Sequence, residues 1–355
     1  MKVKIFAPDL SDEIDKKKCV PLFYPYPLLK QDFEAAVKKH GEWLNGFEFV
    51  DEISLCDFVA PVYYVNDYYK WKKQHLLFEI NAAAAKAGKL TVCWTNGDEG
   101  ITPALKNFHL FRTGGYRHKN KGNEFCYPSF FADPVEKYYH NVLPLLTKKA
   151  ERPLIGFCGQ GRAGVLKLVK DIGRNIKQRI QKKTGQRFDD IEKMESHVYN
   201  RSRMLDILER STFVDTNFIR HKLYRAGVRN KDERENSNLQ FYENMKASPY
   251  IYCYRGNGNY SVRLYETLAS GRIPLMVRTD NNLPWETKID WRIFPQVPST
   301  ETNNVDKILA QFHQGLSEDD FVNLQKKARK IWEDYLSYRG FMKQFIVQYG
   351  GVFNE

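Results

Sequence analysis

The sequence predicts an α/β fold of two domains, each a parallel β-sheet covered by helices, followed by a C-terminal helical segment. Strand-like and helix-like segments alternate along the chain, which is typical of parallel sheets. The length of 355 residues exceeds what one ordinary domain core needs. The alternation also restarts after a polar linker at 148–153, so two domains are expected in succession.

The first domain is expected over residues 1–148 as a Rossmann-like parallel sheet covered by helices. Apolar runs mark its strands, and helical periodicity or a capping residue marks its helices. The predicted strands cover 2–8, 55–64 and 90–95, and the predicted helices cover 29–40, 72–86 and 133–149. Alternation of this kind indicates a Rossmann-like sheet.

The second domain is expected over 153–335, and residues 336–355 are expected to form a helix that packs back on the first domain. A long amphipathic helix begins near Val165. Its apolar positions are Val165, Leu168, Ile172, Ile176 and Ile180. The other predicted strands cover 153–159, 211–215, 250–254 and 273–277, and the other predicted helices cover 238–247, 261–270 and most of 318–349.

Composition favours a cytoplasmic protein with an anionic partner. The six cysteines form no CxxC motif and lie in apolar runs, which indicates reduced, buried thiols. The N-terminus reads as a strand, and no apolar run approaches the length of a membrane span. The net charge of +12 favours an anionic partner, which could be nucleotide phosphates, an acidic glycan, a phospholipid-linked acceptor at a membrane surface or nucleic acid. Between Lys167 and Arg187 eight basic residues stand against one acid, which indicates either an ordinary solvated helix face or attraction of an acidic glycan or of anionic lipid headgroups at the inner face of a membrane.

The most informative segment is 248–277, which reads as strand, glycine-rich loop, helix, turn and strand. Gly256 and Gly258 allow a backbone to approach a ligand closely, and Ser261 suits the N-cap of the next helix. Free backbone N–H groups of such a loop attract an anion. The sequence therefore predicts a phosphate site here, which also includes Asn257 and Asn259.

Arg263 and Glu266 lie three residues apart and therefore on one face of the predicted helix. The guanidinium fork of Arg263 suits a pyrophosphate, and the carboxylate of Glu266 suits the two ribose hydroxyls of a nucleotide. The alternative interpretation is a local ion pair on a solvated helix face. The loop that precedes the helix favours the binding interpretation.

The run SVRLYETLASGRIPLMV, 261–277, resembles a motif of the exostosin-type glycosyltransferases, and NNLPWETKIDW, 281–291, resembles their next motif in the same order. RPLIGFCGQGRAG, 152–164, is similar to the strand and loop that open the donor domain of that family. The resemblance implies a GT-B architecture of two facing Rossmann-like domains. It also implies inverting sugar transfer, with the donor bound mainly to the second domain and the acceptor to the first. The chain looks like a compact bacterial member that builds surface polysaccharide.

Inverting transfer needs a base for the acceptor hydroxyl and positive charge for the leaving diphosphate. Asp98, followed by Glu99, is the candidate base, because WTNGDEG follows a predicted strand; the alternative is an ordinary turn. The candidate donor-binding residues besides Arg263 and Glu266 are Arg162, Arg220, Arg255, Gly256, Asn257, Gly258, Asn259 and Ser261. No Asp-x-Asp occurs, so we expect no metal and no cofactor, with a UDP- or GDP-linked sugar as substrate.

Two interpretations from other classes stay open. A sugar-nucleotide or glycan-binding module without catalysis would use the same binding residues. A nucleic-acid-binding protein would suit the positive charge, although no zinc-finger spacing or RNP-like motif occurs and no nucleic-acid partner is expected. A dinucleotide oxidoreductase is disfavoured, because no GxGxxG follows the first strand.

Overall fold

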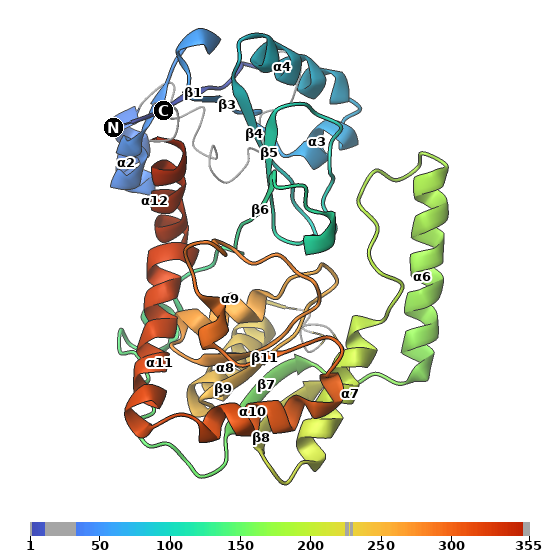
Figure 1. The fold of residues 1–355 in the computed structure, drawn as a ribbon, viewed down its shortest axis with the longest axis vertical. Coiled ribbons are helices and arrows are strands. Elements are labelled where there is room, and N and C mark those ends of the chain that lie inside the picture. Colours follow the sequence, from blue (N-terminus) through green and yellow to red (C-terminus); the bar gives the residue numbers. More distant parts are fainter. Residues whose placement is uncertain (1, 11–32, 224–226, 228–229, 351–355) are drawn as a thin grey trace. The chain divides into compact units, whose positions relative to one another are not determined.

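The computed structural model describes residues 2–10, 33–223, 227 and 230–350 (Figure 1). The beginning of the helix expected at 29–40 and Cys19 lie outside the described residues. The other five cysteines are free thiols with buried side chains, as expected. Among the described helices, none has both the length and the apolar character that crossing a membrane requires.

The chain divides into two compact units. The first unit comprises 1–127, 188–190 and 338–355, and the second comprises 128–187 and 191–337. The observed boundary therefore differs from the one expected at 148, since the segment after residue 127 belongs to the second unit.

The first unit contains a six-stranded parallel sheet in the order β2-β1-β3-β4-β5-β6. Its strands are β1 Val3–Phe6, β2 Phe47–Phe49, β3 Phe58–Val59, β4 Leu90–Trp94, β5 Phe108–Arg112 and β6 Glu124–Cys126. Its helices include α2 Phe33–His40, α3 Val65–Lys70 and α4 Gln74–Lys86. The strands β3, β4 and β5 form the buried centre of this sheet, which explains their apolar residues.

Helix α12, Tyr338–Tyr349, packs within this first unit. Phe341 and Phe345 are fully buried, and their rings contact Trp94 of β4 and Phe111 of β5 at centroid distances of 5.4–6.1 Å. The aromatic side chains that are frequent in this sequence thus build much of the core of the first unit.

The second unit contains a five-stranded parallel sheet in the order β11-β10-β9-β7-β8. Its strands are β7 Leu154–Gln160, β8 Asp215–His221, β9 Tyr250–Cys253, β10 Ile273–Val277 and β11 Gln296–Val297. Its helices are α5 Pro134–Tyr138, α6 Val165–Lys183, α7 His197–Arg210, α8 Lys231–Ala247, α9 Val262–Ala269, α10 Val305–Gln314 and α11 Glu318–Ile331. Two parallel sheets with covering helices confirm the predicted α/β class.

Two predicted elements of the second unit are wrong. The strand expected at 211–215 begins only at Asp215 and continues as the edge strand β8. Every residue of β8 is half-buried, so its sequence has no apolar run to mark it. The helix expected at 133–149 ends as α5 at Tyr138, because His140 and Asn141 adopt positive φ angles of 52° and 62°.

Candidate functional site

The candidate site lies at the carboxyl ends of β7 and β9 in the second unit. After β7 the chain forms β8 on one side, and β9, β10 and β11 then extend the sheet on the other side. The strand order therefore reverses between β7 and β9, which is where ligands of open α/β sheets bind. Two loops leave the sheet here, one leading from β7 to α6 and the other from β9 to α9.

Arg263 extends from the first turn of α9 to the end of β7. Its Nη2 donates a hydrogen bond of 2.8 Å to the carbonyl oxygen of Cys158, and its guanidinium lies 4.4 Å from the ring centroid of Phe157. Gly159 makes room for this arrangement, since a Cβ atom there would lie 2.8 Å from the same Nη2. The backbone of Gly159 also has φ +150°, which favours glycine.

Arg201 of α7 is a second guanidinium at the same strand end, and the sequence did not single it out. Its Nη1 donates to the carbonyl of Gln160 at 2.9 Å, and its Nη2 donates to the carbonyl of Arg255 at 2.7 Å. The first carbonyl belongs to the last residue of β7, and the second lies two residues after the end of β9, the strand beside β7. Only the return of α7 to the sheet brings Arg201 here, and no local pattern marks it.

Arg201 and Arg263 have no ion-pair partner within the described part of the chain, although the carboxylate of Glu266 lies near enough to interact with the charge of Arg263. Both bind carbonyl oxygens, neither forms an ion pair with a described carboxylate, and the Nε of each is buried without a hydrogen-bond partner among the described residues. Burial, with the neighbouring charge of Arg263, lowers the pKa of Arg201 to about 10, so Arg201 remains charged at neutral pH. Two adjacent unneutralised guanidinium groups attract an anion such as a pyrophosphate.

Glu266 lies one turn after Arg263 on α9, and its carboxylate makes no hydrogen bond or ion pair with a described residue. It is half-buried near Tyr242 of α8. Burial raises the pKa of Glu266 to about 7, although the charge of Arg263 lowers it. The alternative interpretation, a local ion pair with Arg263, is thus not confirmed, and the carboxylate oxygens are left to accept hydrogen bonds from a ligand.

The raised pKa of Glu266 predicts a stability that depends on pH. The folded protein binds the proton of Glu266 more tightly than the unfolded chain does, because the pKa is about 7 in the folded state against 4.5 in the unfolded state. The stability that this proton contributes is therefore fully present below pH 4.5 and is lost as the pH rises through 7. Glu266→Gln should therefore stabilise the nucleotide-free protein at pH 8, by about 1–2 kcal/mol after allowing for partial exposure. The measurement is urea unfolding of both proteins at pH 5 and pH 8.

Glu243→Gln is the matched control, because Glu243 is 61% exposed on α8 in the same unit. We expect this control to leave the change in stability between pH 5 and pH 8 unaltered. If the Glu266→Gln protein is less stable than the parent at pH 8, burial of the ionised carboxylate does not destabilise the fold.

The glycine-rich loop differs from the expected phosphate cradle. The N–H of Gly256 donates to the carbonyl of Tyr260 at 2.9 Å, and the N–H of Tyr260 donates to Gly258 at 2.8 Å, so the loop closes on itself. Neither glycine has a positive φ angle. Ser261 occupies the N-cap position of α9, but its side chain makes no capping hydrogen bond. These two N–H groups of the loop are therefore not free to bind an anion, so binding of an anion here would depend more on side chains.

Two of the predicted donor-binding arginines are neutralised by carboxylates. The buried Arg255 pairs with Glu192 in a close contact and with Glu195 at 3.4 Å, and it donates to the carbonyl of Asn257. Arg220 pairs with Asp206 and Glu209, each at 2.6 Å. Both arginines hold the backbone in place rather than present a free charge.

The remaining predicted residues of the loops divide between surface and core. Arg162 is exposed after β7 and forms no ion pair with a described residue. Asn257 is exposed at the tip of its loop. Asn259 is fully buried, where its side chain exchanges hydrogen bonds of 3.1 and 2.7 Å with Thr279. Asn259 thus ties the loop after β9 to the segment after β10.

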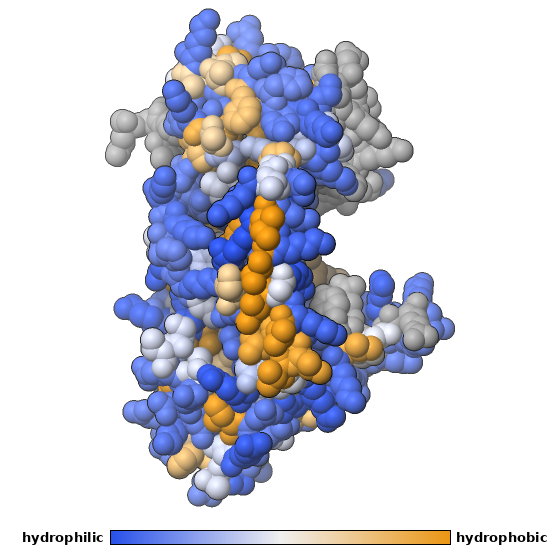
Figure 2. Space-filling view, turned by 90° about the vertical axis from the view of Figure 1, so that its right-hand side faces the viewer, coloured by the Kyte–Doolittle hydropathy of each residue, from blue (hydrophilic) through white to orange (hydrophobic). Residues whose placement is uncertain are grey.

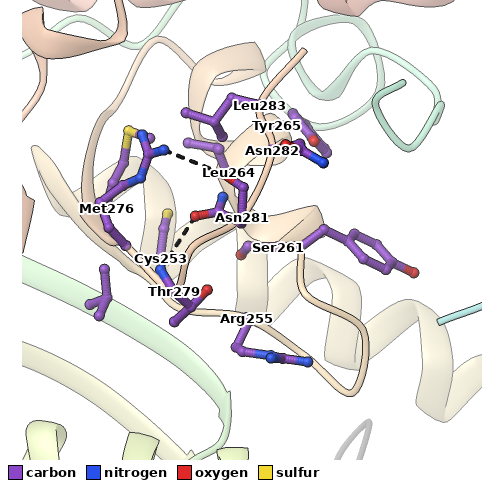
Figure 3. Close-up of a pocket in the computed structure, with 13 residues that line it drawn as sticks. Cys253, Arg255, Ser261, Leu264, Tyr265, Met276, Thr279, Asn281, Asn282 and Leu283 are labelled. Atoms are coloured by element: carbon purple, nitrogen blue, oxygen red, sulfur yellow. Dashed lines mark hydrogen bonds between the residues drawn. The ribbon is translucent and has the colours of Figure 1, made fainter. Parts of the chain in front are cut away.

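A small cavity lies beside α9, and neither Arg263 nor Glu266 lines it. Figure 3 shows the side chains around it. Ser261, Leu264 and Tyr265 line it from α9 and its cap, and Asn281 and Asn282 line it from the segment after β10. Its volume of about 20 Å³ holds about one water molecule. The cavity is therefore too small for a nucleotide.

The second motif of the exostosin resemblance, 281–291, forms a structural loop. Trp291 is buried and donates from its indole to the carbonyl of Pro284 at 3.1 Å. Glu286 accepts a hydrogen bond from the N–H of Leu283 at 3.1 Å. These contacts explain the residue pattern by folding alone.

In the first unit, the candidate base Asp98 lies in the loop after the central strand β4. Thr95 donates its hydroxyl to Asn66 of α3 at 2.6 Å, and Arg112 of β5 donates to the carbonyl of Glu99 at 2.6 Å. Asp98 and Glu99 are half-buried in this supported loop. Ligands of parallel sheets bind at such strand ends, so Asp98 stays the predicted base.

His109 is not a stronger candidate for the catalytic base than Asp98, and no metal site is found among the described residues. His109 of β5 is a core residue, since its Nδ1 lies 2.9 Å from the hydroxyl of Tyr349 and burial lowers its pKa. Among the described residues, no group of three or more His, Cys, Asp or Glu side chains is arranged to hold a metal ion.

No family model and no curated protein matches this chain. Similar solved structures include an alpha1,3-fucosyltransferase at 9% identity, covering 98% of this chain and 89% of that chain with a TM-score of 0.35. WaaG, a glycosyltransferase involved in lipopolysaccharide biosynthesis, is 11% identical, with 98% and 100% covered and a TM-score of 0.33. Anabaena HepE in complex with UDP-glucose is 8% identical, with 97% and 98% covered and a TM-score of 0.35. Likenesses this low carry no functional argument, and membership of the exostosin family stays a prediction.

Proposed function

We propose that this protein is a glycosyltransferase of the exostosin type and of GT-B architecture, which transfers a sugar from a UDP- or GDP-linked donor to a glycan acceptor. The observation that carries the proposal is the unneutralised pair Arg201 and Arg263 at the reversal point of the second sheet, with the unpartnered carboxylate of Glu266 one turn away. The pyrophosphate of a nucleoside diphosphate would bind Arg201 and Arg263, and its ribose hydroxyls would donate hydrogen bonds to Glu266.

The reaction is a single displacement with inversion. The acceptor's hydroxyl oxygen forms a bond to the anomeric carbon while the bond from that carbon to the diphosphate oxygen breaks. The diphosphate leaves with the electron pair, and Arg201 and Arg263 stabilise its growing negative charge. Asp98 takes the proton from the acceptor hydroxyl. Because two guanidinium groups supply positive charge, this route requires no divalent cation.

The protein acts in the cytoplasm, at the inner face of a membrane, on a glycan that becomes surface polysaccharide. The net charge of +12 supports this placement, because both a growing acidic glycan and the inner membrane surface are anionic.

A thermal-shift screen of the purified protein tests the donor class. We expect one of UDP, GDP, CDP and TDP, at about 100 times its Kd, to raise the Tm by about 3–8 °C, since a ligand of the native state stabilises it. The shift should persist in EDTA. Incubation with the matching sugar nucleotide should then release free sugar or a glycosylated acceptor.

The control ligands separate the other interpretations. A nucleotide shift without sugar release from any donor would favour a binding module that lacks catalysis. A shift with a short oligonucleotide, and with none of the diphosphates, would refute the transferase. Loss of the nucleotide shift in EDTA would refute the metal-independent route.

A further inference from the structure

Helix α6 is attached to the second unit by its polar side. Asp171 is buried and accepts a hydrogen bond of 2.6 Å from the hydroxyl of Ser196. Asn175 is also buried, and its amide donates to the backbone carbonyls of Lys193 and Glu195. One turn later, Arg179 donates to the carbonyl of Glu192 at 2.9 Å. Hydrogen bonds to one segment, 192–196, therefore hold the helix.

The apolar side of α6 faces solvent. Its exposed side chains are Val165 at 64%, Leu166 at 80%, Val169 at 62%, Ile176 at 45% and Ile180 at 57% exposure. Figure 2 shows them as a continuous hydrophobic stripe along the helix, bordered by hydrophilic residues. A stripe of this length is unusual on a surface that stays in water, and it marks an interaction site.

The stripe is bordered by cations. Lys170 lies one turn from Leu166 and Lys177 one turn from Ile180, both on the edge away from Asp171. Both lysines are exposed, and neither forms an ion pair with a described residue, whereas Lys167 and Arg174 pair with Asp171. An apolar stripe beside free lysines is the pattern of helices that lie in the interface of an anionic bilayer.

We propose that α6 is a membrane-contacting helix, which inserts its stripe of Val165, Val169, Ile176 and Ile180 into an anionic bilayer surface while Lys170 and Lys177 contact lipid phosphates. Charge selects this occupant. Two copies of the helix packed stripe to stripe would bring unneutralised lysines together, whereas a lipid surface neutralises them. Membrane contact by α6 follows from the exposed side chains of this helix and does not depend on the proposed sugar transfer.

The test is co-sedimentation of the full-length protein with vesicles of phosphatidylcholine alone or with 30% phosphatidylglycerol. We expect binding to the anionic vesicles that falls at high salt, and little binding to phosphatidylcholine. Val169→Gln/Ile176→Gln/Ile180→Gln should lower the affinity at least tenfold. Lys170→Glu/Lys177→Glu should lower it about thirtyfold or more.

Matched variants control for hydrophobicity and net charge. Val142→Gln/Leu239→Gln removes apolar side chains that are 67% and 45% exposed elsewhere on the second unit. Lys307→Glu/Lys326→Glu changes the net charge by the same amount at exposed positions of α10 and α11. Both should bind vesicles like the parent, and thermal melting should show that all variants are folded.

Three results would overturn the inference. Equal sedimentation with neutral and anionic vesicles would show that charge does not guide binding. Unchanged binding of both α6 variants would place the contact elsewhere. A dimer in analytical ultracentrifugation that the triple glutamine variant dissociates, without any change in vesicle binding, would show that the stripe covers a second copy.

Discussion

Arg263→Ala is expected to raise the Kd for the nucleoside diphosphate by about 10- to 100-fold, because it removes a charged hydrogen-bond donor from the phosphates. The rate of transfer should fall further, by about 10²–10³ in kcat, since the leaving diphosphate gains charge in the transition state. We expect this effect at Arg263 because its guanidinium lies at the end of β7 and forms no ion pair with a described carboxylate.

Isothermal titration with the diphosphate measures the first effect, and turnover of the sugar nucleotide measures the second. Arg263→Lys keeps the charge without the planar fork and should lie between parent and alanine variant. Arg292→Ala is the control, since its side chain is 88% exposed and pairs with Asp290. Parent-like diphosphate binding by a folded Arg263→Ala protein would remove the basis of the proposed site.

Arg201→Met should weaken diphosphate binding as Arg263→Ala does, and its effect distinguishes the observed site from the predicted one. Because both guanidinium groups would hold one pyrophosphate, the double variant should lose less than the product of the two single effects. Arg220→Met, which removes an arginine already paired with Asp206 and Glu209, should destabilise the fold more than it weakens diphosphate binding.

Asp98→Asn is expected to lower kcat by about 10²–10⁴ while diphosphate binding stays within about twofold of the parent value, because a general base acts on the acceptor and not on the donor. Asparagine keeps the size and polarity of the side chain, so the supported loop after β4 should persist.

Glu99→Gln is the matched variant, since it makes the same chemical change at the next position of the same loop. If Glu99 is the base, this variant loses the rate and Asp98→Asn keeps it, which would exchange the two roles. Normal turnover by both variants would exclude this loop from proton transfer and leave Asp98 as a turn residue.

Local patterns predicted the fold class and the elements around Arg263. Alternating strands and helices indicated parallel sheets, and the strand, loop and helix around Arg263 occur as predicted. Patterns failed where an element lacks an apolar run, as at the half-buried edge strand β8. Local patterns also failed at α5, because His140 and Asn141 after this helix adopt positive φ angles that no sequence pattern predicts.

The sequence by itself determined that Arg263 and Glu266 share one face of a helix at a strand end, because helical spacing is a local property. Only the tertiary structure decided which arginines keep a free charge. Arg255 meets Glu192 and Glu195, which are distant in sequence, whereas Arg201 donates to carbonyl oxygens at the end of β7 and after β9 and forms no ion pair with a described residue. Ion pairs form between side chains that the packing of the sheet and helices brings within a few ångströms of each other. Sequence periodicity does not predict these distances, because the paired residues are far apart in the sequence.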